Sequence, residues 1–173
     1  SKARPGYGFV LEEGGRVEGT DKTNTWHIDP LDGTSNFLHG IPHFAISVGL
    51  EREGVLIAGV VYNVVRDELF WAEKGQGAYL NDRRLRVAAR NEIADALIAT
   101  GTPFVGRPGH DKFLDEMARV IAKSAGVRRF GAAALDLAYV AAGRFDGFWE
   151  RDLSSWDLAA GAVLARQQLT GSR

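Results

Sequence analysis

The sequence of 173 residues predicts an α+β fold made of two closely joined subdomains. The first half is rich in Val, Ile, Phe and Trp and is interrupted by tight polar turns, which is typical of an antiparallel sheet. After residue 94 short apolar strands alternate with helical patterns, which indicates a layered α/β region. We therefore predict a sheet subdomain over residues 1–90 and an α/β subdomain over residues 91–173.

In the first half, strands are expected over residues 7–13, 25–29, 43–53, 55–65 and 68–74, with a hairpin over residues 77–87. Glu53-Gly54 and Arg66-Asp67 separate the middle strands, so an antiparallel meander is the simplest arrangement. Pro30 favours an extended conformation at the residue before it, which should make Asp29 the last residue of its strand. Thr34 fits the N-cap of a short helix that follows.

In the second half, strands are expected over residues 96–101, 127–130 and 145–150, and helices over residues 109–126, 132–143 and 154–169. The first of these helices carries its apolar side chains on one stripe. The stripe consists of Phe113, Leu114, Met117, Val120 and Ile121.

Composition excludes several classes of protein. The net charge of −1 gives no argument for binding nucleic acid or an anionic membrane. The apolar runs are too short for a membrane span, and residues 1–20 lack the apolar core of a signal peptide. The absence of cysteine rules out disulfides and thiolate metal sites, and it is compatible with the cytoplasmic location that we expect.

The segment TWHIDPLDGTSNFLHG, residues 25–40, brings two carboxylates unusually close together. Asp29 and Asp32 are three residues apart, and a turn between them can place both side chains on one side. A divalent cation such as Mg²⁺ binds carboxylate and carbonyl oxygens, and the carbonyl of Leu31 is a further oxygen of that kind. The alternative is an ordinary Asp-Gly turn with no ligand.

Other acidic residues could complete a metal site. Glu12 ends a predicted strand, Glu150 ends another, and Asp157 lies in the first turn of a predicted helix. Each also has a plain structural interpretation: solvated residues at strand ends, and for Asp157 a capping arrangement with Ser154. Only their convergence in the fold would favour a metal site.

Taken in order, the motifs EE, WHIDPLDGTSNF, GAAALDLA, FWE and WDLAAG resemble the inositol monophosphatase family, and its bacterial members most closely. The resemblance covers about residues 5–168. It implies a layered α-β-α-β-α sandwich in which acidic residues hold about two or three Mg²⁺ ions. It also implies hydrolysis of a small-molecule sugar-alcohol phosphate, such as inositol 1-phosphate, by a metal-activated water.

The resemblance assigns roles residue by residue. The implied metal ligands are Glu12, Asp29, the carbonyl of Leu31, Asp32 and Asp157. The implied catalytic residues are Glu12, Asp32 and Thr34, whose hydroxyl would orient the attacking water. The implied substrate contacts are Asp32, Gly33, Thr34, Gly131, Ala132, Ala133, Glu150 and Asp157.

The chain also departs from the family pattern. Family members extend further at both ends, so we expect an incomplete copy whose full-length form is a homodimer. Ala132 stands where a hydroxyl is more usual, and His27 stands where an aliphatic residue is usual. His27 could approach the metal site, but a tolerated polar substitution is the simpler interpretation. The alternatives are a sister phosphatase, of the fructose-1,6-bisphosphatase or nucleotide 3′-phosphatase type, or a non-catalytic copy that binds transcription complexes.

Overall fold

The structure is a computed structural model that describes the backbone of residues 2–170 and the side chains of residues 2–167. Ser1 and the end of the predicted second subdomain, residues 171–173, lie outside the described residues. The elements are β1 (Gly8–Leu11), β2 (Gly15–Val17), β3 (Asn24–Asp32), α1 (Thr34–Leu38), β4 (Ala45–Arg52), β5 (Val55–Asn63), β6 (Glu68–Glu73), β7 (Gly77–Leu80), β8 (Arg83–Arg84), a 3₁₀ turn (Ile93–Asp95), β9 (Leu97–Thr100), α2 (His110–Ile121), β10 (Gly126–Arg128), α3 (Ala133–Ala141), β11 (Gly147–Trp149) and α4 (Ser155–Thr170).

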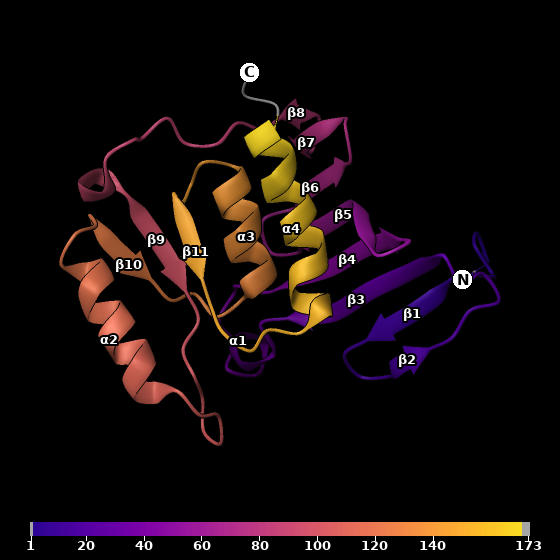
Figure 1. Ribbon diagram of the computed structural model, residues 1–173, viewed down its shortest axis with the longest axis horizontal. Helices are drawn as coiled ribbons and strands as arrows, with labels where there is room; N and C mark the ends of the chain where they lie inside the picture. The colour runs from indigo at the N-terminus through magenta and orange to yellow at the C-terminus, as the bar shows by residue number, and fades with distance from the viewer. Residues whose placement is uncertain (1, 171–173) are drawn as a thin grey trace.

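The elements stack in layers (Figure 1). An eight-stranded sheet has the order β2-β1-β3-β4-β5-β6-β7-β8, and a three-stranded sheet has the order β10-β9-β11. Helices α3 and α4 lie between the two sheets, and α2 covers the outer side of the small sheet. This arrangement agrees with the predicted α+β sandwich.

The antiparallel meander is confirmed from β3 to β8, where every neighbouring pair of strands is antiparallel. The prediction is wrong at the other end of the sheet, because β1 pairs with β3 in parallel. The cause is β2, which was not predicted: it forms a hairpin with β1, and the chain then crosses to the free side of β1. Parallel pairing places the carboxyl ends of β1 and β3 at the same edge of the sheet.

Strand β3 also continues beyond its predicted end. Asp29 is not its last residue, because the strand resumes pairing with β4 at Asp32 after an irregularity in register. Pro30, which has no N–H to donate, is exposed in this bulge. The N-cap of α1 is Gly33, with φ 89°, and Thr34 is instead the first residue of the helix.

Helix α4 packs unusually close to the large sheet. Gly49 on β4 lies directly opposite Gly59 on β5, and both face the helix. A Cβ atom at Gly59 would lie 2.6 Å from the carbonyl oxygen of Ala160, and one at Gly49 would lie 2.5 Å from the Cβ of Ala159. The lack of side chains at these two glycines therefore allows α4 to pack directly against the backbone of the sheet. Val61, Phe70, Leu135, Val163 and Leu164 fill the core around this contact.

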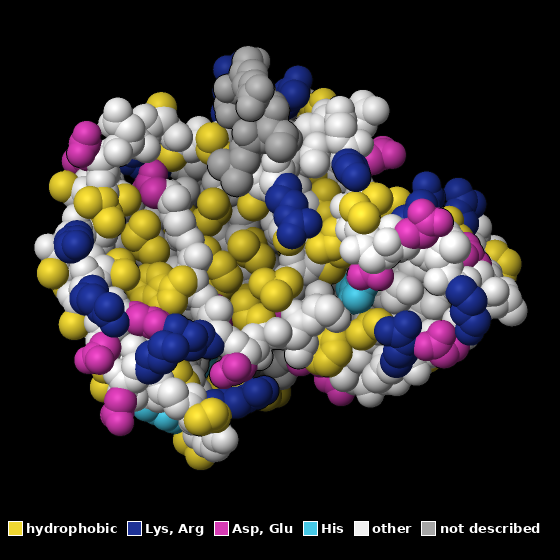
Figure 2. Space-filling view, in the orientation of Figure 1, with side chains coloured by type: hydrophobic (Ala, Val, Ile, Leu, Met, Phe, Trp, Pro, Cys, Tyr) yellow, Lys and Arg dark blue, Asp and Glu magenta, His cyan; other side chains and the backbone are white. Residues whose placement is uncertain are grey.

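The small sheet is entirely parallel, as expected for strands alternating with helices. Hydrophobic side chains gather over β9, β11 and α3 on the face shown in Figure 2. On α2 the predicted stripe is only partly covered, because Phe113 is buried whereas Leu114 and Ile121 are more than half exposed. None of the helices in the described part of the chain combines the length and apolar character needed to cross a bilayer.

The change from one sheet to the other falls between β8 and β9, which brackets the predicted boundary between residues 90 and 91. Helix α4, from the second half of the chain, packs against strands of the first sheet. The two halves therefore share one core, and the division into two subdomains remains a prediction.

Candidate active site

A cavity of about 330 Å³ lies where the carboxyl ends of β1 and β3 meet the first turns of α1, α3 and α4. Ten of the residues assigned from the motifs line this cavity. They are Glu12, Asp29, Leu31, Asp32, Gly33, Thr34, Gly131, Ala133, Glu150 and Asp157. The fold therefore brings together residues that are more than a hundred positions apart in the sequence.

The parallel pairing of β1 and β3 places Glu12 beside Asp29. Leu11 is in register with Ile28, so the next residue on each strand is one of these two acids. Burial, followed by a hydrogen bond to Asp29, raises the pKa of Glu12 to about 7. Burial also raises the pKa of Asp29, to about 6, and the nearby charge of Asp32 adds to this shift. The hydrogen bond to Glu12 lowers the pKa of Asp29 and so opposes part of the effect of burial.

Backbone N–H groups fix the three aspartates in place. The N–H of Leu31 donates to Oδ1 of Asp29 over 2.8 Å. The N–H of Ala134, at the start of α3, donates to Oδ2 of Asp32 over 2.9 Å. Asp157 accepts from the N–H of Ser154 over 2.7 Å, which is the capping contact of its alternative, structural interpretation.

The aspartates also raise each other's pKa. Asp32 is almost fully buried, and burial together with the charge of Asp157 raises its pKa to about 7. Burial, with a contribution from the charge of Glu12, raises the pKa of Asp157. None of the ion pairs between described residues involves any of these four acids. These four acids therefore concentrate negative charge at one side of the cavity, although Arg107, Arg129 and Arg151 also line it.

These residues fit a hard divalent cation. The available donors are carboxylate oxygens and the carbonyl of Leu31, which already accepts a hydrogen bond of 2.9 Å from the Thr34 hydroxyl. Such oxygen donors suit Mg²⁺, and a cation would offset the repulsion that raises the pKa values. Among the described residues, no group of three His, Asp or Glu side chains is arranged closely enough to hold a metal ion as it stands.

The raised pKa values predict how stability depends on pH. A group whose folded pKa is raised stabilises the fold while protonated, and this contribution is lost as pH rises through the folded pKa. Since Glu12, Asp29 and Asp32 titrate near 6 to 7, the melting temperature without metal should fall by roughly 5 °C between pH 5 and pH 8. Mg²⁺ should restore it at pH 8 and have little effect at pH 5.

Differential scanning fluorimetry with EDTA or MgCl₂ measures this, with NaCl of equal ionic strength as control. An equal effect of Mg²⁺ at both pH values would contradict a site built on these carboxylates.

The side of the cavity assigned to substrate is built from three loops. Gly33 and Thr34 lie beside Gly131, because the buried side chain of Asn36 donates to the carbonyl of Phe130 over 2.8 Å and ties α1 to that loop. Ala133 also lines the cavity. Ala132 does not: it is 1% exposed and packs beneath Gly33, so its side chain cannot reach a ligand in the cavity.

Glu150 faces the cavity from the end of β11. Burial raises its pKa to about 7, and the charge of Asp157 adds to the shift. Its carboxyl group rests on Gly101, where a Cβ atom would lie 1.8 Å from the carboxyl carbon. Glu150 can therefore take this position only because Gly101, which follows β9, has no side chain.

His27 shares a face of β3 with Asp29 but does not turn toward the acids. Its Nδ1 lies 2.9 Å from the hydroxyl of Ser155, and its Nε2 lies 3.4 Å from Glu51. The alternative that it approaches the metal site is therefore wrong, and the interpretation as a tolerated polar substitution is retained. It connects β3 to the first turn of α4 instead.

Asp136 is an acid near the site that sequence reasoning missed. It lies on α3, is 1% exposed, and has an Oδ1 atom without a hydrogen-bond partner among the described residues. Burial, together with the charges of Asp32 and Glu150, raises its pKa to about 8. Its signal in the sequence is that it is the one charged residue in the apolar run AAALDLAYVAA.

The chain matches the model of the inositol monophosphatase family over residues 1–168, in agreement with the resemblance of its motifs. It is 62% identical over 169 residues to the inositol-1-monophosphatase of Caulobacter vibrioides, and the alignment covers 96% of this chain and 66% of that relative. It is 49% identical over 170 residues to the Nus factor SuhB of Pseudomonas aeruginosa, and this alignment covers 96% of this chain and 63% of that relative.

Among solved structures, the extragenic suppressor protein suhB of Bartonella henselae superposes with a TM-score of 0.94 at 56% identity. The match covers 97% of this chain and 64% of that one. This likeness confirms the predicted fold class. The chain spans less than two thirds of the length of each of these relatives.

Proposed function

Because the chain belongs to the inositol monophosphatase family, we propose that it is a Mg²⁺-dependent phosphate monoester hydrolase of the inositol-1-monophosphatase type. The observation that carries this proposal is the cavity lined by Glu12, Asp29, Asp32 and Asp157, none of which forms an ion pair with a described residue. The proposed substrate is a small sugar-alcohol phosphate, with inositol 1-phosphate as the reference compound.

Bound Mg²⁺, about two or three ions, would polarise a phosphate oxygen and lower the pKa of a bound water. Glu12, Asp29, Asp32, Asp157 and the carbonyl of Leu31 are the groups that would hold it. The hydroxyl of Thr34, held against the carbonyl of Leu31, orients the attacking water. Glu12 accepts a hydrogen bond from that water at the open side of the site. No cysteine exists to provide a thiolate nucleophile, which favours direct attack by water.

The substrate alcohol is assigned to the opposite wall of the same cavity. Gly33 and Thr34 contact the phosphate next to Asp32, and the loop at Gly131 to Ala133 meets the ring. Glu150 and Asp157 accept hydrogen bonds from ring hydroxyls. Ala132 contributes backbone only, because its methyl group points away from the cavity wall.

The test is release of phosphate from inositol 1-phosphate with Mg²⁺ and with EDTA. The assay compares this chain with a version extended at both ends to the length of its relatives. A panel containing fructose 1,6-bisphosphate and a nucleotide 3′-phosphate separates the sister phosphatase types. Absence of Mg²⁺-dependent release by both versions from every compound would contradict the proposal.

A second candidate function is non-catalytic association with transcription complexes. The observation that favours it is the 49% identity to a protein named Nus factor SuhB. Intact acidic residues without turnover, together with specific capture of purified transcription proteins, would support this function over catalysis.

For the full-length form we propose a homodimer in the cytoplasm. Exposed apolar side chains support association of copies, since a contiguous apolar surface is unusual on a monomer. Phe37, Leu38 and Ile41, in and just after α1, are each about half exposed or more.

A further inference from the structure

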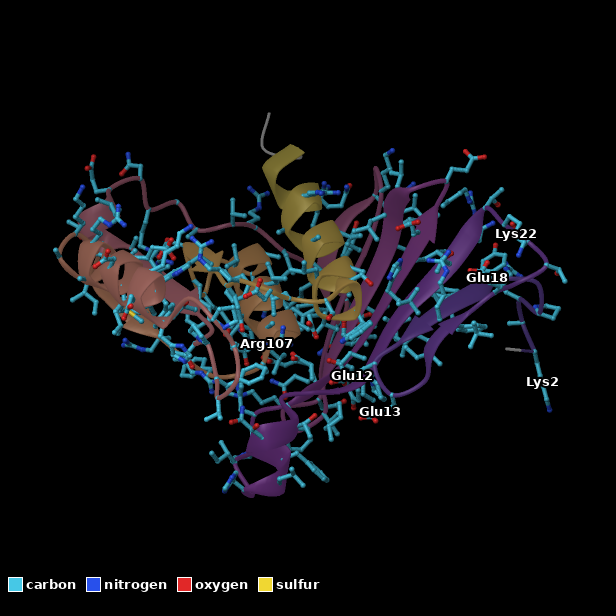
Figure 3. All side chains as sticks on the ribbon, turned by 60° about the horizontal axis from the view of Figure 1, so that its bottom comes forward. Lys2, Glu12, Glu13, Glu18, Lys22 and Arg107 are labelled. Atoms are coloured by element: carbon cyan, nitrogen blue, oxygen red, sulfur yellow. The ribbon has the colours of Figure 1, made fainter. Side chains whose placement is uncertain are left out.

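A second cavity, of about 650 Å³, adjoins the acidic cavity described above, and Arg129 lines both. Glu12 and Arg107, which Figure 3 labels, line only the acidic cavity. The volume of the second cavity lies within the range of sites that bind small molecules. Its lining contains three arginines and no acidic residue from the described part of the chain. The two cavities therefore differ in the sign of their charge.

Aromatic rings form one wall of the second cavity. The centre of the Phe130 ring lies 5.1 Å from that of His43 and 5.7 Å from that of Phe145, which is itself 5.7 Å from Tyr139. The buried side chain of Asn36 donates to the carbonyls of both His43 and Phe130 over 2.8 Å, which holds their loops together. Tyr139 and Phe145 are buried, whereas Phe130 is 39% exposed. Phe130 is therefore the ring whose face a ligand can reach.

His43 adds a flat surface to this wall and no charge. Burial, followed by the charge of Arg66, lowers the pKa of its imidazole, so the ring is neutral near pH 7. The effect of Arg66 on this ring also shows that its guanidinium lies close to the aromatic wall.

The three arginines of the second cavity differ in how far their charge is matched. Arg144 forms an ion pair with Glu68 and lies over the Tyr139 ring, with 4.6 Å between its guanidinium carbon and the ring centre. Arg66 is exposed in the turn between β5 and β6, and only its backbone N–H is used, in a hydrogen bond to Asn63. Its side chain forms no ion pair with any residue that the structure describes. The guanidinium donors of Arg66 are therefore available to a ligand.

Arg129 marks the boundary between the two cavities. A Cβ atom at Gly131 would lie 2.5 Å from its Nη1 atom, so the guanidinium lies against that loop in the space that a side chain would fill. Its charge contributes to lowering the pKa of Glu150 and of Asp136, but it forms no ion pair with a described residue. An anion in the second cavity would thus meet Arg66 and a second guanidinium that is only partly neutralised.

We propose that the second cavity binds an anion that carries a flat aromatic ring, with the anionic group on Arg66 and the ring on Phe130. A guanidinium forms paired hydrogen bonds with phosphate and carboxylate groups, and flat rings pack favourably on aromatic side chains. The ligand binds outside the acidic cavity and is not hydrolysed, so the site does not depend on the proposed phosphatase function.

The test is calorimetric titration in EDTA with four compounds: 1-naphthyl phosphate, 1-naphthoate, 1-naphthol and inorganic phosphate. EDTA prevents metal-dependent binding and turnover in the acidic cavity. Both aromatic anions should bind at least about tenfold more tightly than 1-naphthol, which lacks the charge, and inorganic phosphate, which lacks the ring. The tighter of the two anions identifies the bound group as a phosphate or a carboxylate. Similar affinities for all four compounds, or no binding of either aromatic anion, would overturn the site.

Variants locate the binding. Arg66→Ala should weaken the binding of 1-naphthyl phosphate at least about tenfold, and Arg66→Lys should restore part of the affinity. Arg107→Ala is the matched control, because it removes a guanidinium from the acidic cavity, and its affinity should stay within about twofold. Phe130→Leu keeps an apolar side chain but removes the flat ring, so it should weaken the aromatic anions about fivefold and leave inorganic phosphate within about twofold.

Ile41 lines the second cavity and is also one of the apolar residues that support association of copies. Sedimentation of the unmodified chain and of Arg66→Ala therefore accompanies the titrations. A change in self-association with no change in the affinity for 1-naphthyl phosphate would assign the cavity to a contact between copies and overturn the site. Neither Arg66 nor Phe130 lines the acidic cavity, so such a result would leave the phosphatase proposal intact.

Discussion

Replacing Asp29 by Asn should lower Mg²⁺-dependent phosphate release at least about a hundredfold, because residues that only support metal ligands already cost 10- to 100-fold when changed. Asp29 is 1% exposed and interacts with both Glu12 and Asp32, so it is the acid nearest the centre of the cluster. Asparagine has the same shape and can still accept the hydrogen bond from the N–H of Leu31. The fold should therefore persist while the charge that holds the cation is lost.

The measurement is phosphate release together with thermal unfolding in EDTA at pH 8. The variant should melt at the same or a higher temperature, because the ionised carboxylate is unfavourable in the buried site without metal. Glu13→Gln is the control: this exposed acid adjoins Glu12 but does not line the cavity. Near-normal turnover by Asp29→Asn would show that the assignment of the metal site is wrong.

Replacing Gly59 by Ala should destabilise the chain by about 2 kcal/mol, the range typical of overpacking a core. The added Cβ would lie 2.6 Å from the carbonyl oxygen and 2.8 Å from the Cα of Ala160. These are backbone atoms of α4, so the helix itself must move. Because Asp157 is in the first turn of α4, the substitution should also weaken Mg²⁺ binding.

Urea unfolding and calorimetric titration with Mg²⁺ measure the two effects. Gly126→Ala serves as the matched control on β10, where the new Cβ would meet only the ends of the Arg128 and Leu97 side chains. Its effect should stay within about 0.5 kcal/mol. Equal stability of the two variants would mean that the contact between α4 and the sheet is not as tight as the structure indicates.

Local patterns were sufficient to predict most of the elements, but not which strands pair. The turn at Glu53-Gly54 adopts positive φ at both residues, as a two-residue hairpin requires, and β4 and β5 pair around it. The pairing of β1 with β3 could not be predicted, because apolar alternation identifies a strand without specifying its neighbour. The short exposed strand β2, which decides that pairing, has no apolar alternation of its own.

The same limit applies to the site. The acids of the motifs were assigned from the resemblance of those motifs to the family, and the structure places them around one cavity. Asp136 was missed because a single acid within an apolar helix resembles a tolerated core residue until its neighbours are known.

The parallel contact between β1 and β3 also links ligand binding to local unfolding. Strand β1 has only the short strand β2 on its outer side, so this border of the sheet has few contacts that resist opening. A cation bound by both Glu12 and Asp29 would connect β1, near the edge of the sheet, to β3 in its interior. Separation of β1 from β3 would then require release of the ion, so ion binding would stabilise β1 against local unfolding.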